Sequence, residues 1–199
     1  VIDEAREKGA LVGVNHPKCN LCPYKWGDDD IFDTVEVWNG PMRRINEEGI
    51  SYFFSLIRQG KKKALVGGSD YHRRKGLVKM GNPTTIISVE DRRPESILSS
   101  LKEGRSYVTM SPKGPFLSLE CNGKSFGESV ETDSEASFHA SSSSLPPFSI
   151  LEVVFSDGKT IRVKGRRGRA EINGKACKGT WFYLRAFIKI PMGKEWILS

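Results

Sequence analysis

The sequence has no long hydrophobic run, few histidines and few cysteines. No apolar stretch approaches the ~18 residues that a membrane-spanning helix requires, so we expect no membrane partner. Only three histidines, His16, His72 and His139, are present as imidazole ligands for a metal. The four cysteines do not settle the redox compartment. The net charge of +7 is spread over the whole chain, and it favours anionic ligands without specifying one.

Residues 1–112 alternate predicted strands and helices. Gly60 and Gly104 end two of these helices, Pro94 starts one, and Gly49 is expected to break the long one. This rhythm indicates a parallel sheet with crossover helices, either open or closed into a barrel. The first helix starts in mid-turn, so we expect a chain cut from something longer. The predicted strands are residues 10–14, 34–38, 64–66, 84–89 and 106–109, and the predicted helices are residues 1–9, 41–59 and one from Pro94 to Gly104.

Residues 113–199 contain only short predicted strands. Asp157-Gly158 predicts a tight hairpin turn, because this pair supplies the positive φ angles that such a turn needs. Six or seven short strands without a helix indicate a small β-sandwich. We therefore expect an α/β domain over residues 1–112 and an all-β sandwich over residues 113–199. The predicted strands are residues 116–121, 136–141, 150–155, 160–164, 170–173, 181–190 and 195–198.

Two motifs place metal-binding side chains where predicted strands end. Residues 12–17 run from apolar positions into Asn15-His16-Pro17, and residues 65–72 run from apolar positions into Asp70-Tyr71-His72. Strand ends in α/β folds are where ligands gather. An Asp-x-His pair with a separate histidine supplies one carboxylate and two imidazoles. This ligand set suits zinc, manganese or iron.

These motifs, in this order, resemble part of a known family. Asn15-His16-Pro17, residues 36–40 (EVWNG) and residues 68–72 (GSDYH) are similar to the later half of a PHP domain, the polymerase and histidinol phosphatase superfamily of metal-dependent phosphoesterases. The similarity extends through residues 81–85 and 95–109. With a β-rich domain behind it, this tail resembles the carbaryl-hydrolase-like branch of the superfamily.

The resemblance implies a partial distorted (β/α)7 barrel, containing its later strands only, and a site for up to three divalent metals (Zn, Mn or Fe). It implies that His16, Asp70 and His72 are metal ligands, with Asp70 and His72 the catalytic pair. The family's other ligands come from an earlier His-x-His motif, further histidines and a bridging Glu, which this chain lacks. We therefore expect the missing N-terminal half of the barrel to be a partner and the 199-residue chain alone to be nearly inactive.

The expected reaction is hydrolysis of a small anionic substrate, a phosphoester, by metal-activated water. A carbamate or carboxylic ester remains open, because the carbaryl-hydrolase-like branch cleaves that bond type. Arg73 or Arg74 is a candidate to bind the phosphate, against the alternative of a solvated loop charge. Glu36 and Asn39 are candidates to bind substrate, against the alternative of hydrogen bonds that only support the site.

Other patterns leave several interpretations open. Cys19 and Cys22 are compatible with half of a zinc site, with a redox pair or with an ordinary loop pair, and the last is favoured. His139 is expected to be structural. Residues 164–169 (KGRRGR) predict a hairpin turn, and nucleic acid is not expected as a partner because no aromatic stacking platform accompanies them. The alternative function is a noncatalytic module that binds a partner or glycan, with a relic barrel.

Overall fold

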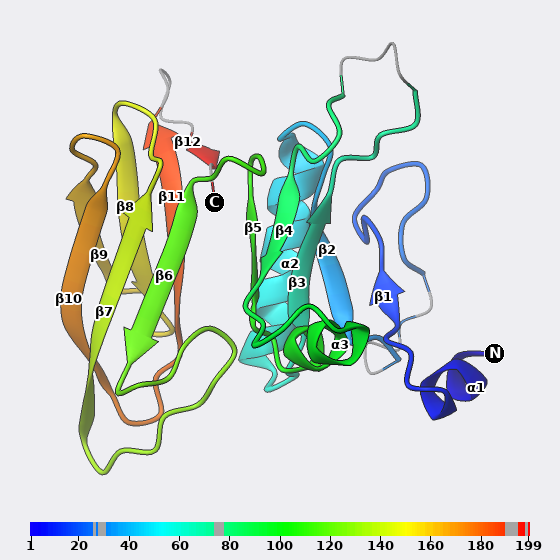
Figure 1. Ribbon diagram of the computed structural model, residues 1–199, viewed down its shortest axis with the longest axis horizontal. Coiled ribbons are helices and arrows are strands. Elements are labelled where there is room, and N and C mark those ends of the chain that lie inside the picture. The colour runs from blue at the N-terminus through cyan, green and yellow to red at the C-terminus, as the bar shows by residue number, and fades with distance from the viewer. Residues whose placement is uncertain (26, 28–30, 74–77, 190–194, 198) are drawn as a thin grey trace. The chain divides into compact units, whose positions relative to one another are not determined.

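The computed structural model describes residues 1–25, 27, 31–73, 78–189, 195–197 and 199. The chain divides into two compact units, Val1–Val108 and Thr109–Ser199, whereas the sequence places the boundary at residue 112. The first unit mixes helices with a parallel sheet, and the second consists of antiparallel sheets, as expected at that level (Figure 1). The described residues form no closed barrel. Within this described part of the chain, no helix is long and apolar enough to cross a membrane.

The centre of the first unit is a three-stranded parallel sheet. Strand β2 (Thr34–Asn39) lies between β1 (Gly13–Val14) and β3 (Ala64–Gly68) and pairs with both. Val35 in β2 is fully buried, as expected for the middle strand of a covered sheet. The other elements are α1 (Ile2–Glu7), α2 (Arg44–Arg58), β4 (Thr84–Ile87), α3 (Pro94–Lys102) and β5 (Ser106–Thr109), and β4 and β5 form a separate two-stranded sheet.

Strand β1 is shorter than the predicted strand over residues 10–14. The Val12 amide donates to Asp33 Oδ2 at 2.9 Å, and the Val12 carbonyl accepts from the amides of Asp33 and Thr34. The ladder therefore begins only at Gly13, which pairs with Thr34. A Cβ on Gly13 would lie 2.7 Å from Thr34 Oγ1, so the close approach of the two strands requires glycine here.

Helix α2 covers the middle strand and runs without a break through Gly49. The expectation that Gly49 interrupts the helix is wrong, and its place in the packing gives the reason. A Cβ on Gly49 would lie 3.2 Å from the Val37 carbonyl oxygen and 3.6 Å from Val37 Cα. The missing side chain lets the helix backbone approach β2. Phe53 and Leu56 are buried on the same helix, as the 3.6-residue period predicts.

The described residues of the second unit form seven strands in two antiparallel sheets. In one sheet the order is β10-β7-β6, and in the other it is β12-β11-β8-β9. Phe138 belongs to the first sheet, and its ring centroid lies 4.9 Å from that of Phe182 and 5.9 Å from that of Phe155, both in the second sheet. The strands are β6 (Phe116–Cys121), β7 (Glu135–Ser143), β8 (Ser149–Phe155), β9 (Thr160–Lys164), β10 (Ala170–Cys177), β11 (Phe182–Lys189) and β12 (Glu195–Ile197).

Among the described residues of this unit, one charged side chain lies in the interior. Glu152 of β8 is fully buried, and its two carboxylate oxygens accept from Arg162 Nε on β9 and Arg185 Nε on β11. Each arginine is the residue directly opposite Glu152 in its ladder. A buried carboxylate is tolerated only when it is paired, and here a cation from each neighbouring strand meets that need.

The contact of Gly49 with β2 generates a stability prediction. In an exposed helix, Gly→Ala stabilises by about 1 kcal/mol. In Gly49→Ala the new methyl group meets backbone atoms, which move less readily than side chains. We expect the free energy of unfolding to fall by about 1–3 kcal/mol, as for other overpacked sites.

Chemical denaturation measures this change, with Ser51→Ala as the control because Ser51 is an exposed residue of the same helix. The control is expected to lie within about 0.5 kcal/mol of the wild type. A Gly49→Ala variant as stable as the control would contradict the proposed packing role.

Candidate functional site

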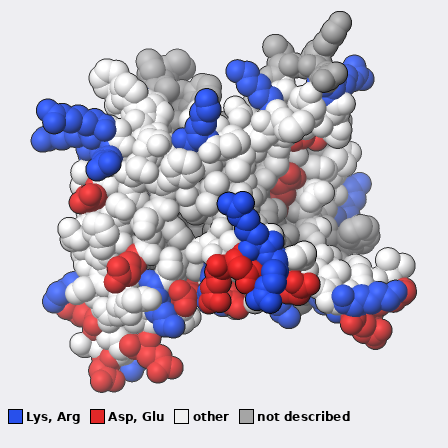
Figure 2. All heavy atoms as spheres, in the orientation of Figure 1, with Lys and Arg blue, Asp and Glu red and all other residues white. Residues whose placement is uncertain are grey.

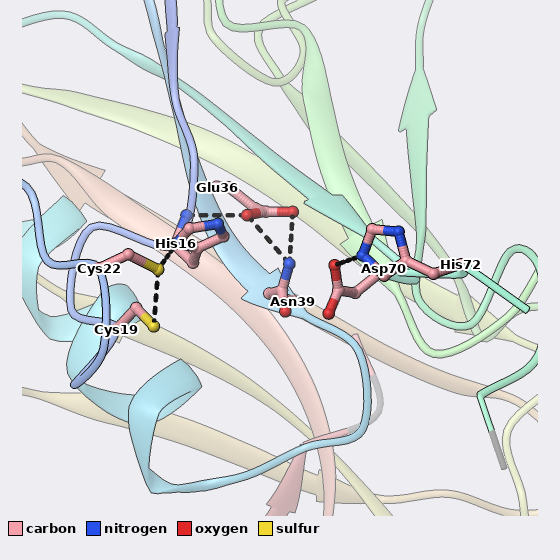
Figure 3. Close-up of polar contacts among 7 residues, drawn as sticks. All are labelled: His16, Cys19, Cys22, Glu36, Asn39, Asp70 and His72. Carbon is pink, nitrogen blue, oxygen red and sulfur yellow. Dashed lines mark hydrogen bonds and ion pairs between the residues drawn. The ribbon is translucent and has the colours of Figure 1, made fainter. Parts of the chain in front are cut away.

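Three adjacent parallel strands end beside one another, and polar residues lie at or just after each of these ends (Figure 3). His16 lies two residues after β1, Asn39 is the last residue of β2, and Asp70 lies two residues after β3. Because parallel strands share the direction of the chain, their carboxyl ends meet at one edge of the sheet. This edge is the candidate functional site.

Glu36 connects the three strand ends. Its Oε2 accepts a hydrogen bond from the His16 backbone amide at 2.8 Å. Asn39 Nδ2 donates to Oε1 and Oε2 at 3.2 and 3.3 Å. A Cβ on Gly68 would lie 3.1 Å from Glu36 Oε1, so glycine in β3 leaves space for the carboxylate. The carboxylate thus fixes the start of the loop after β1. Its observed contacts hold the backbone and neighbouring side chain of the site in place.

A bulge in β2 brings Glu36 and Asn39 together. The pairing with β3 shifts between Glu36 and Trp38, so Val37 is an extra residue in the ladder. In a regular strand, residues three apart point to opposite faces. The extra residue puts the side chains of Glu36 and Asn39 within hydrogen-bond distance of each other. The sequence motif identified both residues, but nothing in its spacing indicated the bulge.

The backbone turns sharply at the strand ends. His16 has φ 33° and Asp70 has φ 52°, values that are uncommon for residues other than glycine. Beside Asp70, Gly40 also has a positive φ, and a Cβ on it would lie 3.8 Å from Asp70 Cβ. Such conformations cost about 1–3 kcal/mol each and persist where surrounding contacts hold them. Two of the three expected metal ligands, His16 and Asp70, therefore have strained backbone conformations.

Asp70 and His72 form a pair on the β3 side of the edge. His72 Nε2 lies 2.8 Å from Asp70 Oδ1, and both side chains are exposed (Figure 3). Arg73, the next residue along the chain, is exposed. Arg74, the other candidate for phosphate binding, lies outside the described residues.

His16 meets two cysteines on the β1 side of the edge. Cys22 Sγ lies 3.5 Å from His16 Nδ1 and 3.1 Å from Cys19 Sγ. The ligand atoms of all three residues lie within 4.8 Å of one another, and no other group of three or more such side chains converges in this way in the described part of the chain. The structure thus gathers His16 with Cys19 and Cys22, whereas Asp70 and His72 form a separate pair.

The two thiols differ in acidity. The hydrogen bond donated by the Cys22 thiol lowers the pKa of Cys19 below its ordinary value, and the same contact raises the pKa of Cys22. The negative charge of Asp70 also acts on both groups: it partly opposes the lowering of the Cys19 pKa and adds to the raising of the Cys22 pKa. Asp70 is therefore close enough to add negative charge to the field around the cysteines. The sequence alone favours an ordinary loop pair for Cys19 and Cys22. Their position against His16 follows only from the fold of the loop.

The third histidine lies elsewhere. His139 on β7 is exposed, and its Nδ1 lies 2.9 Å from Asn173 Oδ1 on β10. The two residues are directly opposite in the ladder between those strands. This cross-strand contact accounts for His139 within the β-rich unit.

Comparison of the chain with protein-family models, with curated proteins and with solved structures found no match.

The hydrogen bond between the two thiols generates a pH prediction. It stabilises the Cys19 thiolate, so removing it in Cys22→Ala is expected to raise the Cys19 pKa toward the ordinary value. The midpoint of Cys19 alkylation should then move to higher pH. Alkylation followed by mass spectrometry between about pH 6 and 9 measures that midpoint.

Cys177→Ala is the control, because Cys177 is an exposed thiol on β10, in the second unit. The control should leave the Cys19 midpoint unchanged. An unchanged midpoint in Cys22→Ala as well would show that the thiol contact does not set the acidity of Cys19.

Proposed function

We propose that the first unit belongs to a metal-dependent hydrolase of the PHP type that cleaves a phosphoester. In this proposal its strands are the later strands of a distorted (β/α)7 barrel, and the rest of the ligand set lies outside these 199 residues. The observation that carries the proposal is that His16, Asn39 and Asp70 lie at or just after the carboxyl ends of three adjacent parallel strands, with Glu36 bonded to the His16 amide. This is the edge where such folds bind ligands.

The donor atoms at this edge suit a divalent metal. His16, Asp70 and His72 offer two imidazoles and one carboxylate, the ligand types that zinc, manganese and iron accept. Up to three such ions belong to the complete site in the proposed family. When bound, the metal supplies a water of lowered pKa and holds the substrate oxygens as negative charge builds on them.

The side chains have separate roles in this reaction. Glu36 holds the His16 backbone, and Asn39 holds the Glu36 carboxylate, so both position a ligand. Asp70 orients the His72 ring through Nε2. Arg73 is exposed beside them and offsets the charge of a phosphoester. During hydrolysis the water oxygen bonds to phosphorus, the ester P–O bond breaks, and the leaving oxygen takes up a proton.

The experiment uses the complete gene product, loaded in turn with Zn²⁺, Mn²⁺ and Fe²⁺, and chromogenic phosphomonoesters, phosphodiesters and carboxylic esters. We expect phosphoester turnover that a chelator removes and that Asp70→Asn lowers at least ~100-fold. The 199-residue chain alone is expected to show little turnover.

His139→Ala is the control, since its hydrogen bond to Asn173 lies within the β-rich unit, and it should retain full activity. Turnover that persists without metal, or in Asp70→Asn, would contradict the proposal. If carboxylic esters are cleaved faster than phosphoesters, metal-dependent hydrolysis would stand, but the phosphoester would be the wrong substrate class.

A second candidate function concerns the β-rich unit, and one exposed aromatic residue favours it. Phe148 is 89% exposed and has φ 64° in the connection between β7 and β8. The Leu145 amide donates to the Gly168 carbonyl, and the Gly165 amide donates to the Ser149 carbonyl. These bonds place the connection that carries Phe148 beside the basic turn after β9.

That turn is strongly cationic. Arg166 and Arg169 exchange backbone hydrogen bonds, and Arg167 and Gly168 have positive φ between them, so the predicted hairpin turn is confirmed. Figure 2 shows basic side chains gathered at this turn. Among the described residues, no ion pair neutralises its four exposed cations, which are Lys164, Arg166, Arg167 and Arg169. Proteins that bind single-stranded nucleic acid combine cations that contact the backbone with aromatic rings that stack on the bases, and this turn offers both.

A short oligothymidylate, followed by fluorescence anisotropy, tests this candidate. Four phosphate contacts predict a slope of about −3 in log affinity against log salt concentration. Phe148→Ala should cost about 1–3 kcal/mol through lost stacking. Lys178→Ala, another exposed cation of the same unit, is the control and should change affinity little. Equal binding of duplex DNA, or unchanged binding by Phe148→Ala, would contradict a stacking surface.

A further inference from the structure

We propose that the loop after β1 binds one zinc ion through His16 Nδ1, Cys19 Sγ and Cys22 Sγ. This site does not rest on the hydrolase proposal, because its other two ligands are thiols that the PHP resemblance does not use. It gives the Cys-x-x-Cys segment a chemical role, and it needs neither Asp70 nor His72.

The observed spacing agrees with tetrahedral zinc. With Zn–N of about 2.0–2.1 Å and Zn–S of about 2.3 Å, neighbouring nitrogen and sulfur ligands lie about 3.5 Å apart. Cys22 Sγ and His16 Nδ1 are 3.5 Å apart. Two sulfur ligands on one zinc lie about 3.8 Å apart by the same geometry. The Sγ atoms of Cys19 and Cys22 are 3.1 Å apart, so zinc binding requires the two thiols to move apart, and the exposed side chain of Cys22 has room to do so.

The loop that carries these ligands is held at both ends. At its start, Glu36 Oε2 accepts from the His16 amide, and the His16 carbonyl accepts from the Cys19 amide at 2.8 Å. At its far end, the Tyr24 amide donates to the Pro17 carbonyl, and the Tyr24 ring packs edge-on against buried Phe32 at 5.5 Å. Two ligands come from one tight turn, and the third follows three residues later. A site so constrained loses little further chain entropy when it binds an ion.

The chemistry of the donors selects the metal. Two thiolates and one imidazole favour zinc or another soft ion over Mg²⁺ and Ca²⁺, which require oxygen ligands. Cys22 is exposed, so an ion can reach the site from solvent. The negative charge of Asp70, which already acts on both thiols, attracts a cation to the same place. Binding replaces two thiol protons, so affinity rises with pH.

Three protein ligands leave a fourth position for water. Structural zinc sites have four protein ligands, whereas sites that act on substrates keep one position open. Among the described residues, no fourth His, Cys, Asp or Glu joins the converging group. The ion is therefore exposed on one side, at the same sheet edge as Asn39 and Asp70.

The experiment measures metal binding by the reduced chain through competition with a chromophoric chelator, and it uses Co²⁺ as a spectroscopic substitute for zinc. We expect one ion per chain and a thiolate-to-cobalt charge-transfer band in the near ultraviolet. Cys19→Ser and Cys22→Ser should each raise the zinc Kd more than ~100-fold, since loss of an outer-shell partner alone costs about 10–100-fold.

Three controls separate zinc binding at this loop from binding at other thiols or at the hydrolase ligands. Cys177→Ser removes an exposed thiol of the second unit and should leave zinc binding unchanged. Asp70→Asn removes a ligand of the proposed hydrolase and should leave the thiolate-to-cobalt band in place. In the unmodified chain, zinc should slow the alkylation of Cys19 and Cys22 but not that of Cys177, a readout that does not depend on how any variant folds.

Three results would overturn the zinc site. The first is zinc binding no tighter in the wild type than in the Cys19/Cys22 double variant. The second is a cobalt spectrum without a thiolate band. The third is loss of binding in Asp70→Asn but not in the cysteine variants, which places the metal on the hydrolase ligands instead. If the protein binds zinc through its thiols but hydrolyses no ester, the zinc site stands and only the hydrolase proposal is contradicted.

Discussion

The parallel pairing of β2 with a strand on each side is the constraint on which the rest of the first unit depends. It buries Val35 and provides the surface that α2 covers through Gly49. It also brings three strand ends, far apart in sequence, to one edge of the sheet. The bulge at Val37 then lets Glu36 reach Asn39 on one side and the loop after β1 on the other. The same pairing of β2 therefore determines both how α2 packs on the sheet and which residues lie at the candidate site.

The polar edge contains two kinds of metal donor. On the β3 side are a carboxylate and an imidazole, which suit hard or borderline ions. On the β1 side are two thiols and an imidazole, which suit soft or borderline ions. His16 is common to both proposals, and its contact with Cys22 places its Nδ1 on the thiol side. Both donor sets accept zinc, so finding zinc in the protein would not by itself show which set holds it.

Much of the fold followed from short-range patterns in the sequence. The seven strands described in the second unit, the turn at Asp157-Gly158 and the helix after Pro94 all depend on alternation, turn residues or caps that act over a few residues. In that turn only Gly158 has the expected positive φ. The failures depend on contacts between distant residues. Gly49 looks like a helix breaker until the backbone of β2 is seen against it, and Cys22 looks unpartnered until the loop brings it to His16. Spacing shows which donors are present, but only tertiary structure shows which of them meet.

The buried carboxylate of Glu152 has a consequence for how the second unit assembles. Its two arginine partners stand directly opposite it on β9 and β11, so three neighbouring strands are aligned by one charge. If either neighbouring strand slipped by one residue against β8, its arginine would turn to the other face and part of the carboxylate would lose its partner. Hydrophobic alternation tolerates a slip of two residues, because the same faces stay buried. The triad does not, so it selects a single alignment from those that the apolar pattern alone would accept.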